Sequence, residues 1–236
     1  MNIGEIISDA LTYPFNNVMA LVIYVVLGII LGLVAGATGL GAIFTGAWNL
    51  GAGAAVAVVG AIICIIIALL IEGYVLDVTR YGIERRGDAP DIEFGRQVAN
   101  GFKLAIVNIV YFIIPIIILA ILGVIFRSWI TTIIGIILFI IFGVAEYMGE
   151  CRLANTDDLG YALSVGSAIN DAARIGLLKI LLVVIIISII EGIIQVITTA
   201  LLGFNPYLGG FIGGILSVYF LFFAARATGL LYSEIA

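Results

Sequence analysis

The chain has 236 residues, of which 64% are hydrophobic and 11% charged, with ten Lys and Arg, fifteen Asp and Glu and no His. Soluble domains are about half apolar and a quarter charged, and roughly half or more of any folded surface still meets solvent. The composition therefore excludes a water-soluble globular protein and a disordered chain. The net charge of −5 argues against binding to nucleic-acid phosphates. The class of protein that this composition fits is an integral membrane protein.

Long charge-free stretches predict six membrane-spanning helices, because an α-helix needs about 20 apolar residues to cross the hydrocarbon core. Residues 10–71 hold no charged side chain, and the glycine cluster around Trp48 and Asn49 predicts a turn between two spans. Continuous Ile, Val and Leu runs lack the alternation of membrane β-strands. The expected spans are 18–36, 53–76, 104–126, 128–145, 176–201 and 208–230, with a polar break at Arg127-Ser128.

Nine of the ten cationic residues fall on one side of these spans, and Arg127 alone falls on the other. Short loops rich in Lys and Arg stay in the cytoplasm. We therefore expect a multi-pass protein of the cell membrane with both termini and both basic loops in the cytoplasm.

A short amphipathic segment precedes each pair of spans, and helices of this kind can lie in the headgroup plane. The polar side of the second segment carries Arg96, Gln97 and Asn100, and that of the third carries Asp171 and Arg174. The apolar positions are Ile3, Ile6, Ile7, Ala10 and Leu11 in the first segment, Phe94, Val98 and Phe102 in the second, and Leu159, Leu163, Ile169 and Ala173 in the third.

These segments define a repeating unit of interfacial helix, span, outer turn and span, at about 1–80, 88–152 and 156–236 of a single transmembrane domain over 1–236. Two crossings return the chain to its starting side, so the three repeats are parallel and related by an axis along the membrane normal. The predicted fold class is an all-α integral membrane protein with six transmembrane helices in three such repeats. The alternative is that any six-span chain shows three hairpins without true repetition.

The second unit carries a pattern of Gly73-Tyr74, Arg80, Gly87, Pro90, Phe94, Gly101 and Lys103. This pattern resembles an uncharacterised family of multi-pass membrane proteins of archaea and bacteria, known as a domain of unknown function. The resemblance extends loosely over the whole chain, and only this loop is distinctive. It implies a prokaryotic cell membrane and transfers no catalytic or ligand-binding residue.

Ionisable groups within the hydrocarbon are costly, so the deepest one, Glu191, requires a reason. Ser188, Glu191, Gln195 and Thr198 lie at offsets that place them on one face of the fifth span. We expect this polar stripe to face protein or an internal crevice. It is either a hydrogen-bonded contact between helices or part of a proton or ion pathway.

Glu72, Glu146 and Arg226 lie near the cytoplasmic end of the second span of their units. If the units pack around a common axis, these ends meet, and we expect Arg226 to pair with at least one of the two carboxylates. The alternative is that the three side chains reach the interface separately.

Glycines recur at four-residue spacing and predict close helix packing, either within the chain or with another copy. They are Gly28, Gly32 and Gly36 in the first span and Gly209, Gly210, Gly213 and Gly214 in the sixth.

Catalytic motifs are missing from the sequence: it has no His, no H-E-x-x-H and no phosphate-binding G-x-x-x-x-G-K-[ST] loop. The acidic loop residues Asp88, Asp91 and Glu93 lie among arginines and are expected to be solvated, and metal-assisted headgroup chemistry there is the weaker alternative. We expect no catalytic residue, no metal site and no cofactor.

The sequence thus favours a non-enzymatic membrane protein that acts by assembly, as a homo-oligomer or as a membrane-embedded subunit of a larger complex. Its partners are membrane lipids and itself or other membrane subunits, with no nucleic acid. An ion or small-solute channel or transporter using the polar stripe is the alternative, and an intramembrane enzyme comes third.

Overall fold

The computed structural model describes residues 1–125 and 129–236, and within these ranges the chain is helical, with no strand. Arg127 and Ser128, expected to break the third and fourth spans, lie outside the described residues. The helices are α1 (Ile3–Asn16), α2 (Val18–Trp48), α3 (Leu50–Ile83), α4 (Phe94–Ile125), α5 (Trp129–Thr156), α6 (Leu159–Ala162), α7 (Val165–Ile175), α8 (Leu177–Phe204) and α9 (Pro206–Tyr232).

Six of these helices, α2, α3, α4, α5, α8 and α9, are long and apolar enough to cross a membrane, which confirms the prediction of a multi-pass membrane protein. They hold between 27 and 34 residues. At 1.5 Å per residue each is about 40–51 Å long, more than the roughly 30 Å of hydrocarbon. The helices therefore extend beyond the hydrocarbon or cross it at a tilt.

The predicted turn around Trp48 and Asn49 is present, but the expected end of the first span at residue 36 and start of the second at residue 53 are wrong, because α2 continues through the glycine cluster to Trp48 and α3 begins at Leu50. The turn is the single residue Asn49, whose side chain accepts a hydrogen bond from the Ala52 amide at 3.2 Å and caps α3. The glycines allow close helix contact instead: a Cβ on Gly53 would lie 2.6 Å from the Gly46 Cα. In lipid an open backbone has no water to bind, so helix is retained where glycines in water predict a turn.

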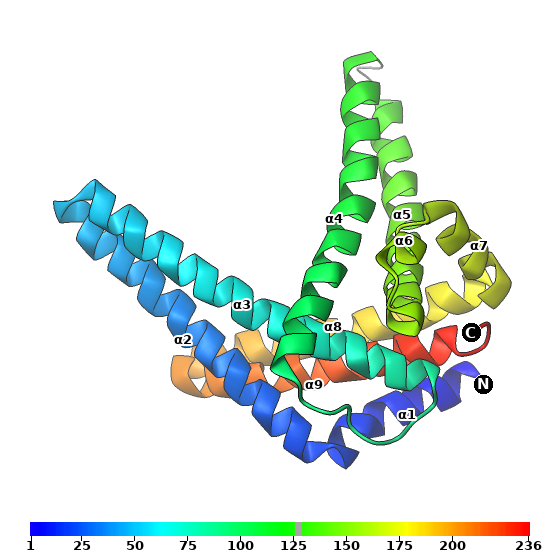
Figure 1. Ribbon diagram of the computed structural model, residues 1–236, viewed down its shortest axis with the longest axis horizontal. Helices are drawn as coiled ribbons and strands as arrows, with labels where there is room; N and C mark the ends of the chain where they lie inside the picture. Colours follow the sequence, from blue (N-terminus) through cyan, green and yellow to red (C-terminus); the bar gives the residue numbers. More distant parts are fainter. Residues whose placement is uncertain (126–128) are drawn as a thin grey trace.

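The six long helices form three hairpins, α2/α3, α4/α5 and α8/α9, which meet at one end and diverge from it (Figure 1). Contacts between hairpins run mainly through α3, α5 and α9, the second helix of each, and through the first turns of α4 on α3. Helix α1 packs on α9, and α7 packs on α5. We call the region where the hairpins meet the base and the diverging parts the arms.

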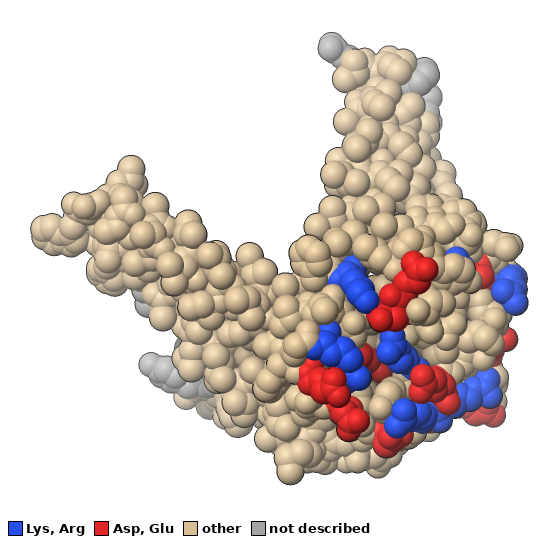
Figure 2. Space-filling model, viewed as in Figure 1, with Lys and Arg blue, Asp and Glu red and all other residues tan. Residues whose placement is uncertain are grey.

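Charged side chains gather at the base, whereas the arms visible in Figure 2 show no charged side chain. Large hydrophobic residues such as Ile62, Ile117 and Ile185 are exposed along the arms. This surface suits the hydrocarbon of a bilayer and not water.

Of the three amphipathic segments, the first forms the separate helix α1, and the third is divided into two helices, α6 and α7. The second is not a separate helix, because residues 94–103 are the first turns of α4. Residues 94–103 also turn their polar side, and not their apolar side, toward the protein core. Gln97 is 0% and Asn100 4% exposed, whereas Phe94 and Phe102 are 54% and 59% exposed. The polar side packs against α3, and the phenylalanines face outward.

Candidate functional site

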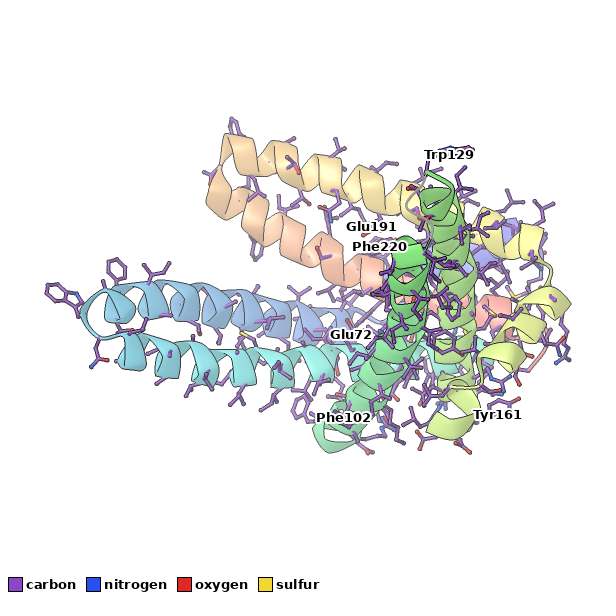
Figure 3. The ribbon with its side chains drawn as sticks, turned by 90° about the horizontal axis from the view of Figure 1, so that it is seen from above. Glu72, Phe102, Trp129, Tyr161, Glu191 and Phe220 are labelled. Carbon is purple, nitrogen blue, oxygen red and sulfur yellow. The ribbon has the colours of Figure 1, made fainter. Side chains whose placement is uncertain are left out.

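Two of the carboxylates expected to meet near the ends of the second spans do so, and a third joins them. Glu72 of α3 and Glu146 and Glu150 of α5 line a cavity of about 250 Å³ between α3, α5 and α9. We call it the acidic cavity. Its remaining wall includes Phe220 and Thr228 of α9. In Figure 3, Glu72 and Phe220 lie where the three hairpins approach one another.

These three carboxylates form no ion pair or hydrogen bond with any described residue. Glu146 and Glu150 are four residues apart and therefore share one face of α5. Thr228 is 6% exposed, and no described residue forms a hydrogen bond with its hydroxyl. The cavity thus presents negative charge and a free hydroxyl without a compensating cation.

The expected pairing of Arg226 with Glu72 or Glu146 is wrong. Arg226 is 2% exposed, and its Nε donates to Asp9 Oδ1 of α1 at 2.7 Å. Its Nη1 donates to the backbone carbonyls of Tyr81 and Arg86. The amphipathic helix α1 packs on α9 and brings a carboxylate to Arg226, so this side chain turns away from the acidic cavity.

The polar stripe of α8 divides between two environments. Thr198 packs against Gly213 of the neighbouring α9. Ser188, Glu191 and Gln195 are exposed. Glu191 lies on the side of its hairpin that is turned toward the other two hairpins (Figure 3). Within the chain, therefore, only Thr198 is covered by protein.

Of the glycines predicted to pack helices, some contact a neighbouring helix of the chain and others do not. A Cβ on Gly209 would collide with the backbone of Leu202, and one on Gly213 would meet Thr198, so both hold α9 close to α8. A Cβ on Gly28 would lie at an ordinary contact distance of 3.7 Å from Val218 Cγ2 of α9. The remaining four, with nothing within 4 Å of a Cβ, are Gly32, Gly36, Gly210 and Gly214.

Sequence reasoning missed a buried polar network at the crossing of α3 and α4. Asn100 Nδ2 donates to Asp77 Oδ1 at 3.1 Å, and Arg96 Nη2 lies 3.3 Å from Asp77 Oδ2. The Tyr24 hydroxyl of α2 donates to Gln97 Oε1 at 2.7 Å. These contacts join α2, α3 and α4 inside the base.

Glycines permit this crossing, and they could have revealed it. A Cβ on Gly73 would overlap the Gln97 carbonyl, and one on Gly101 would overlap the Leu69 carbonyl. Both glycines belong to the pattern that carries the family resemblance. Two small residues on successive spans indicate a close crossing.

A second buried network joins α5, α7 and α9. Arg152 Nη1 donates to Asp171 Oδ2 at 2.5 Å, and the Tyr232 hydroxyl donates to the same oxygen at 3.1 Å. The Arg152 guanidinium also lies 3.5 Å from the centre of the Tyr161 ring. No group of three or more His, Cys, Asp or Glu side chains within residues 1–125 and 129–236 is arranged to hold a metal ion.

The model of a family described as "Protein of unknown function (DUF4013)" matches residues 56–203, which is more than half of the chain. The chain belongs to the DUF4013 family. This confirms the resemblance to an uncharacterised family. The DUF4013 match includes Glu72, Glu146, Glu150 and Glu191, whereas Arg226 lies beyond it. Neither a curated protein nor a solved structure matches the chain.

Proposed function

We propose that this protein has a non-enzymatic function and acts by assembly in the membrane, as a homo-oligomer whose copies contact one another through the arms. The observation that carries the proposal is the arrangement of the hairpins, which contact one another at the base and diverge beyond it (Figure 1). Their facing sides are consequently not covered by the chain itself. Membrane helices from another copy fit between them.

The uncovered faces carry the residue types that join helices in lipid. Gly32 and Gly36 of α2 leave room for a second backbone to approach. Glu191 and Gln195 of α8 are polar and exposed, and polar groups in hydrocarbon are costly until they are hydrogen-bonded. A Gln amide both donates and accepts, so the same face on two copies is self-complementary.

We also propose that the three hairpin units are parallel repeats around an axis along the membrane normal. The packing supports this, because the first helical segment of each unit lies on the last helix of the preceding unit. Helix α1 lies on α9, the first turns of α4 lie on α3, and α7 lies on α5. The turns of the first and third hairpins support it too. Asn49 has φ −151° and ψ 109°, and Asn205 has φ −151° and ψ 112°. Each side chain accepts from the amide three residues later.

For orientation, we propose that the base faces the cytoplasm of an archaeal or bacterial cell and that α1 and α7 lie at this interface. The cationic side chains of the described residues belong to the base, and positive residues favour the cytoplasmic side. Trp48 and Trp129, 92% and 72% exposed, lie at the far ends of two arms, a position that suits an opposite interface.

Native mass spectrometry of the full chain, purified in a mild detergent, tests the assembly. We expect a defined oligomer of the chain alone. In a Cys64→Ala/Cys151→Ala background, Gln195→Cys should form a disulfide between copies in native membranes. Ser8→Cys, on the exposed side of α1, is the matched control and should not. A monomer under all conditions, without this cross-link, would overturn the proposal. An oligomer found only with a different protein would replace it by a subunit of a mixed complex.

A cation channel or transporter is the second candidate, because the acidic cavity and the exposed Glu191 place unpaired carboxylates between the hairpins. Its test is flux in reconstituted vesicles. A pH-dependent cation flux that is lost in Glu191→Gln would favour transport, since the amide cannot carry a proton or a charge. If Glu191→Gln instead preserves the oligomer and no flux occurs in either protein, assembly is the function.

A further inference from the structure

We infer that the acidic cavity binds an alkylammonium cation. The cavity carries uncompensated acidic groups. Glu72, Glu146 and Glu150 line it, and no described Lys or Arg pairs with any of them. Arg226 of α9, two residues before Thr228, is paired with Asp9. Carboxylates at a partly enclosed site need a compensating positive charge, which a ligand can supply.

The geometry favours an organic cation over a metal ion. The three carboxylates do not converge as a metal-holding group. A metal requires several oxygens at about 2–2.6 Å from a single point. A volume of about 250 Å³ instead accommodates a cation of several carbon and nitrogen atoms. A chain with an ammonium group at each end can reach more than one carboxylate.

The walls supply what the rest of such a ligand requires. Phe220 and Tyr147 line the cavity, and aromatic rings attract ammonium groups and cover the methylenes between them. Leu221 and Ala224 add apolar surface.

Thr228 also supplies a polar group to the cavity. Its side chain lines the cavity although the residue is only 6% exposed, and no described residue forms a hydrogen bond with its hydroxyl. This oxygen is free to accept a hydrogen bond from an ammonium N–H, and the carboxylates accept the remaining N–H groups.

An ammonium group can come from a free diamine or polyamine, or from the headgroup of an aminolipid. Isothermal titration of the full chain in a maltoside detergent, which carries no ammonium, tests the free source with putrescine and spermidine at constant ionic strength. We expect saturable binding that Glu150→Gln and Glu146→Gln each weaken at least about tenfold. The exposed loop variant Glu93→Gln, which also removes one carboxylate, should stay within about twofold.

The lipid source is tested by native mass spectrometry of protein released from nanodiscs with and without phosphatidylethanolamine. Retention of this lipid by the wild type, and its loss in Glu150→Gln, assigns the site to a headgroup. If neither amine nor aminolipid binds, or if both carboxylate variants bind like the wild type, the inference is overturned. It is also overturned if Mg²⁺ at equal ionic strength displaces putrescine at lower concentration than spermidine does.

Loss of folding is controlled in two ways. Each variant is compared with the wild type by size exclusion and by protection of the buried Cys151 thiol from a reactive dye. Thr228→Val keeps the shape of the side chain and removes only the hydroxyl. We expect it to weaken amine binding about three- to tenfold, and unchanged binding would contradict the assigned role of Thr228.

Discussion

At the base, helices from different hairpins are joined by buried ion pairs and side-chain hydrogen bonds, such as Arg152–Asp171 and Tyr24–Gln97. Along the arms, the two helices of one hairpin meet through glycines and small side chains, such as Gly46 with Gly53 and Thr38 with Gly60. Polar side-chain contacts are thus concentrated where the hairpins must be positioned against one another. Each arm needs only close packing between two neighbours.

The largest loss of stability is expected when the Arg152–Asp171 pair of the base is broken, because these side chains are only 3% and 8% exposed. Asp171→Ala leaves the Arg152 charge buried without its partner, so we expect a loss of about 3–5 kcal/mol in the free energy of unfolding. The measurement is unfolding in a sodium dodecyl sulfate titration, followed by dye reaction of Cys151 in a Cys64→Ala background.

The exposed pair of Arg86 and Asp88 is the matched control. The Arg86 hydrogen bond lowers the pKa of Asp88, but both side chains are in contact with solvent. Asp88→Ala should therefore leave the unfolding curve unchanged. Equal effects of the two alanine variants would show that the buried pair does not hold the base together.

The second test concerns the α3/α4 crossing. A Cβ on Gly73 would overlap the Gln97 backbone, so Gly73→Ala should destabilise the base by about 2–3 kcal/mol. Gly123→Ala in the arm part of α4, where nothing lies within 4 Å, should be neutral or slightly stabilising. The same titration measures both, and a Gly73→Ala protein as stable as Gly123→Ala would contradict the crossing.

A smaller effect is expected for the Tyr24–Gln97 hydrogen bond. Gln97→Leu leaves the buried Tyr24 hydroxyl without its acceptor, and we expect a loss of about 1–2 kcal/mol. Adding Tyr24→Phe to Gln97→Leu should recover part of this loss, because both polar partners are then removed. A double-mutant cycle measures the coupling, and additive effects would mean that the two side chains do not interact.

The smallest effect is a pH dependence at Glu234. Burial raises the pKa of this carboxyl, but hydrogen bonds from Lys179 and the Met1 amine outweigh burial and hold the pKa below its ordinary value of 4.5. A lowered folded-state pKa contributes stability above the ordinary value, and this stability is lost as the pH falls through the folded-state value.

We therefore expect the wild type to lose about 1 kcal/mol or less as the pH is lowered from about 5 to 3, relative to Glu234→Gln. Unfolding titrations at a series of pH values compare the two proteins. Parallel curves over this range would show that the contact with Lys179 contributes nothing to stability.

The number of spans could be predicted because hydrocarbon length and the position of charged residues constrain it directly. The end of α2 could not, because the same glycines are typical of a turn in water and of close helix packing in lipid. A turn and a close helix contact can be told apart only when the partner helix is known. Gly53 of α3 faces Gly46 of α2, which lies seven residues earlier in the chain and on the other side of the turn.

Amphipathic periodicity identified a segment before the third span with one polar and one apolar side. It did not show which of the two sides faces the protein. Gln97 and Asn100 face the protein because Tyr24 and Asp77 offer hydrogen-bond partners there, while Phe94 faces outward. The partner of Arg226 was beyond sequence reasoning for a similar reason. Asp9 lies 217 residues away, and only the docking of α1 on α9 brings the two together.

The divergence of the three hairpins has a consequence for the bilayer itself. Hairpins that meet at the base are spread apart at their tips (Figure 1). If the base lies at one surface of a bilayer, the outline of the protein, with whatever lies between its arms, is wider in one leaflet than in the other. A chain of this outline is expected to collect where a membrane is already bent in the matching direction.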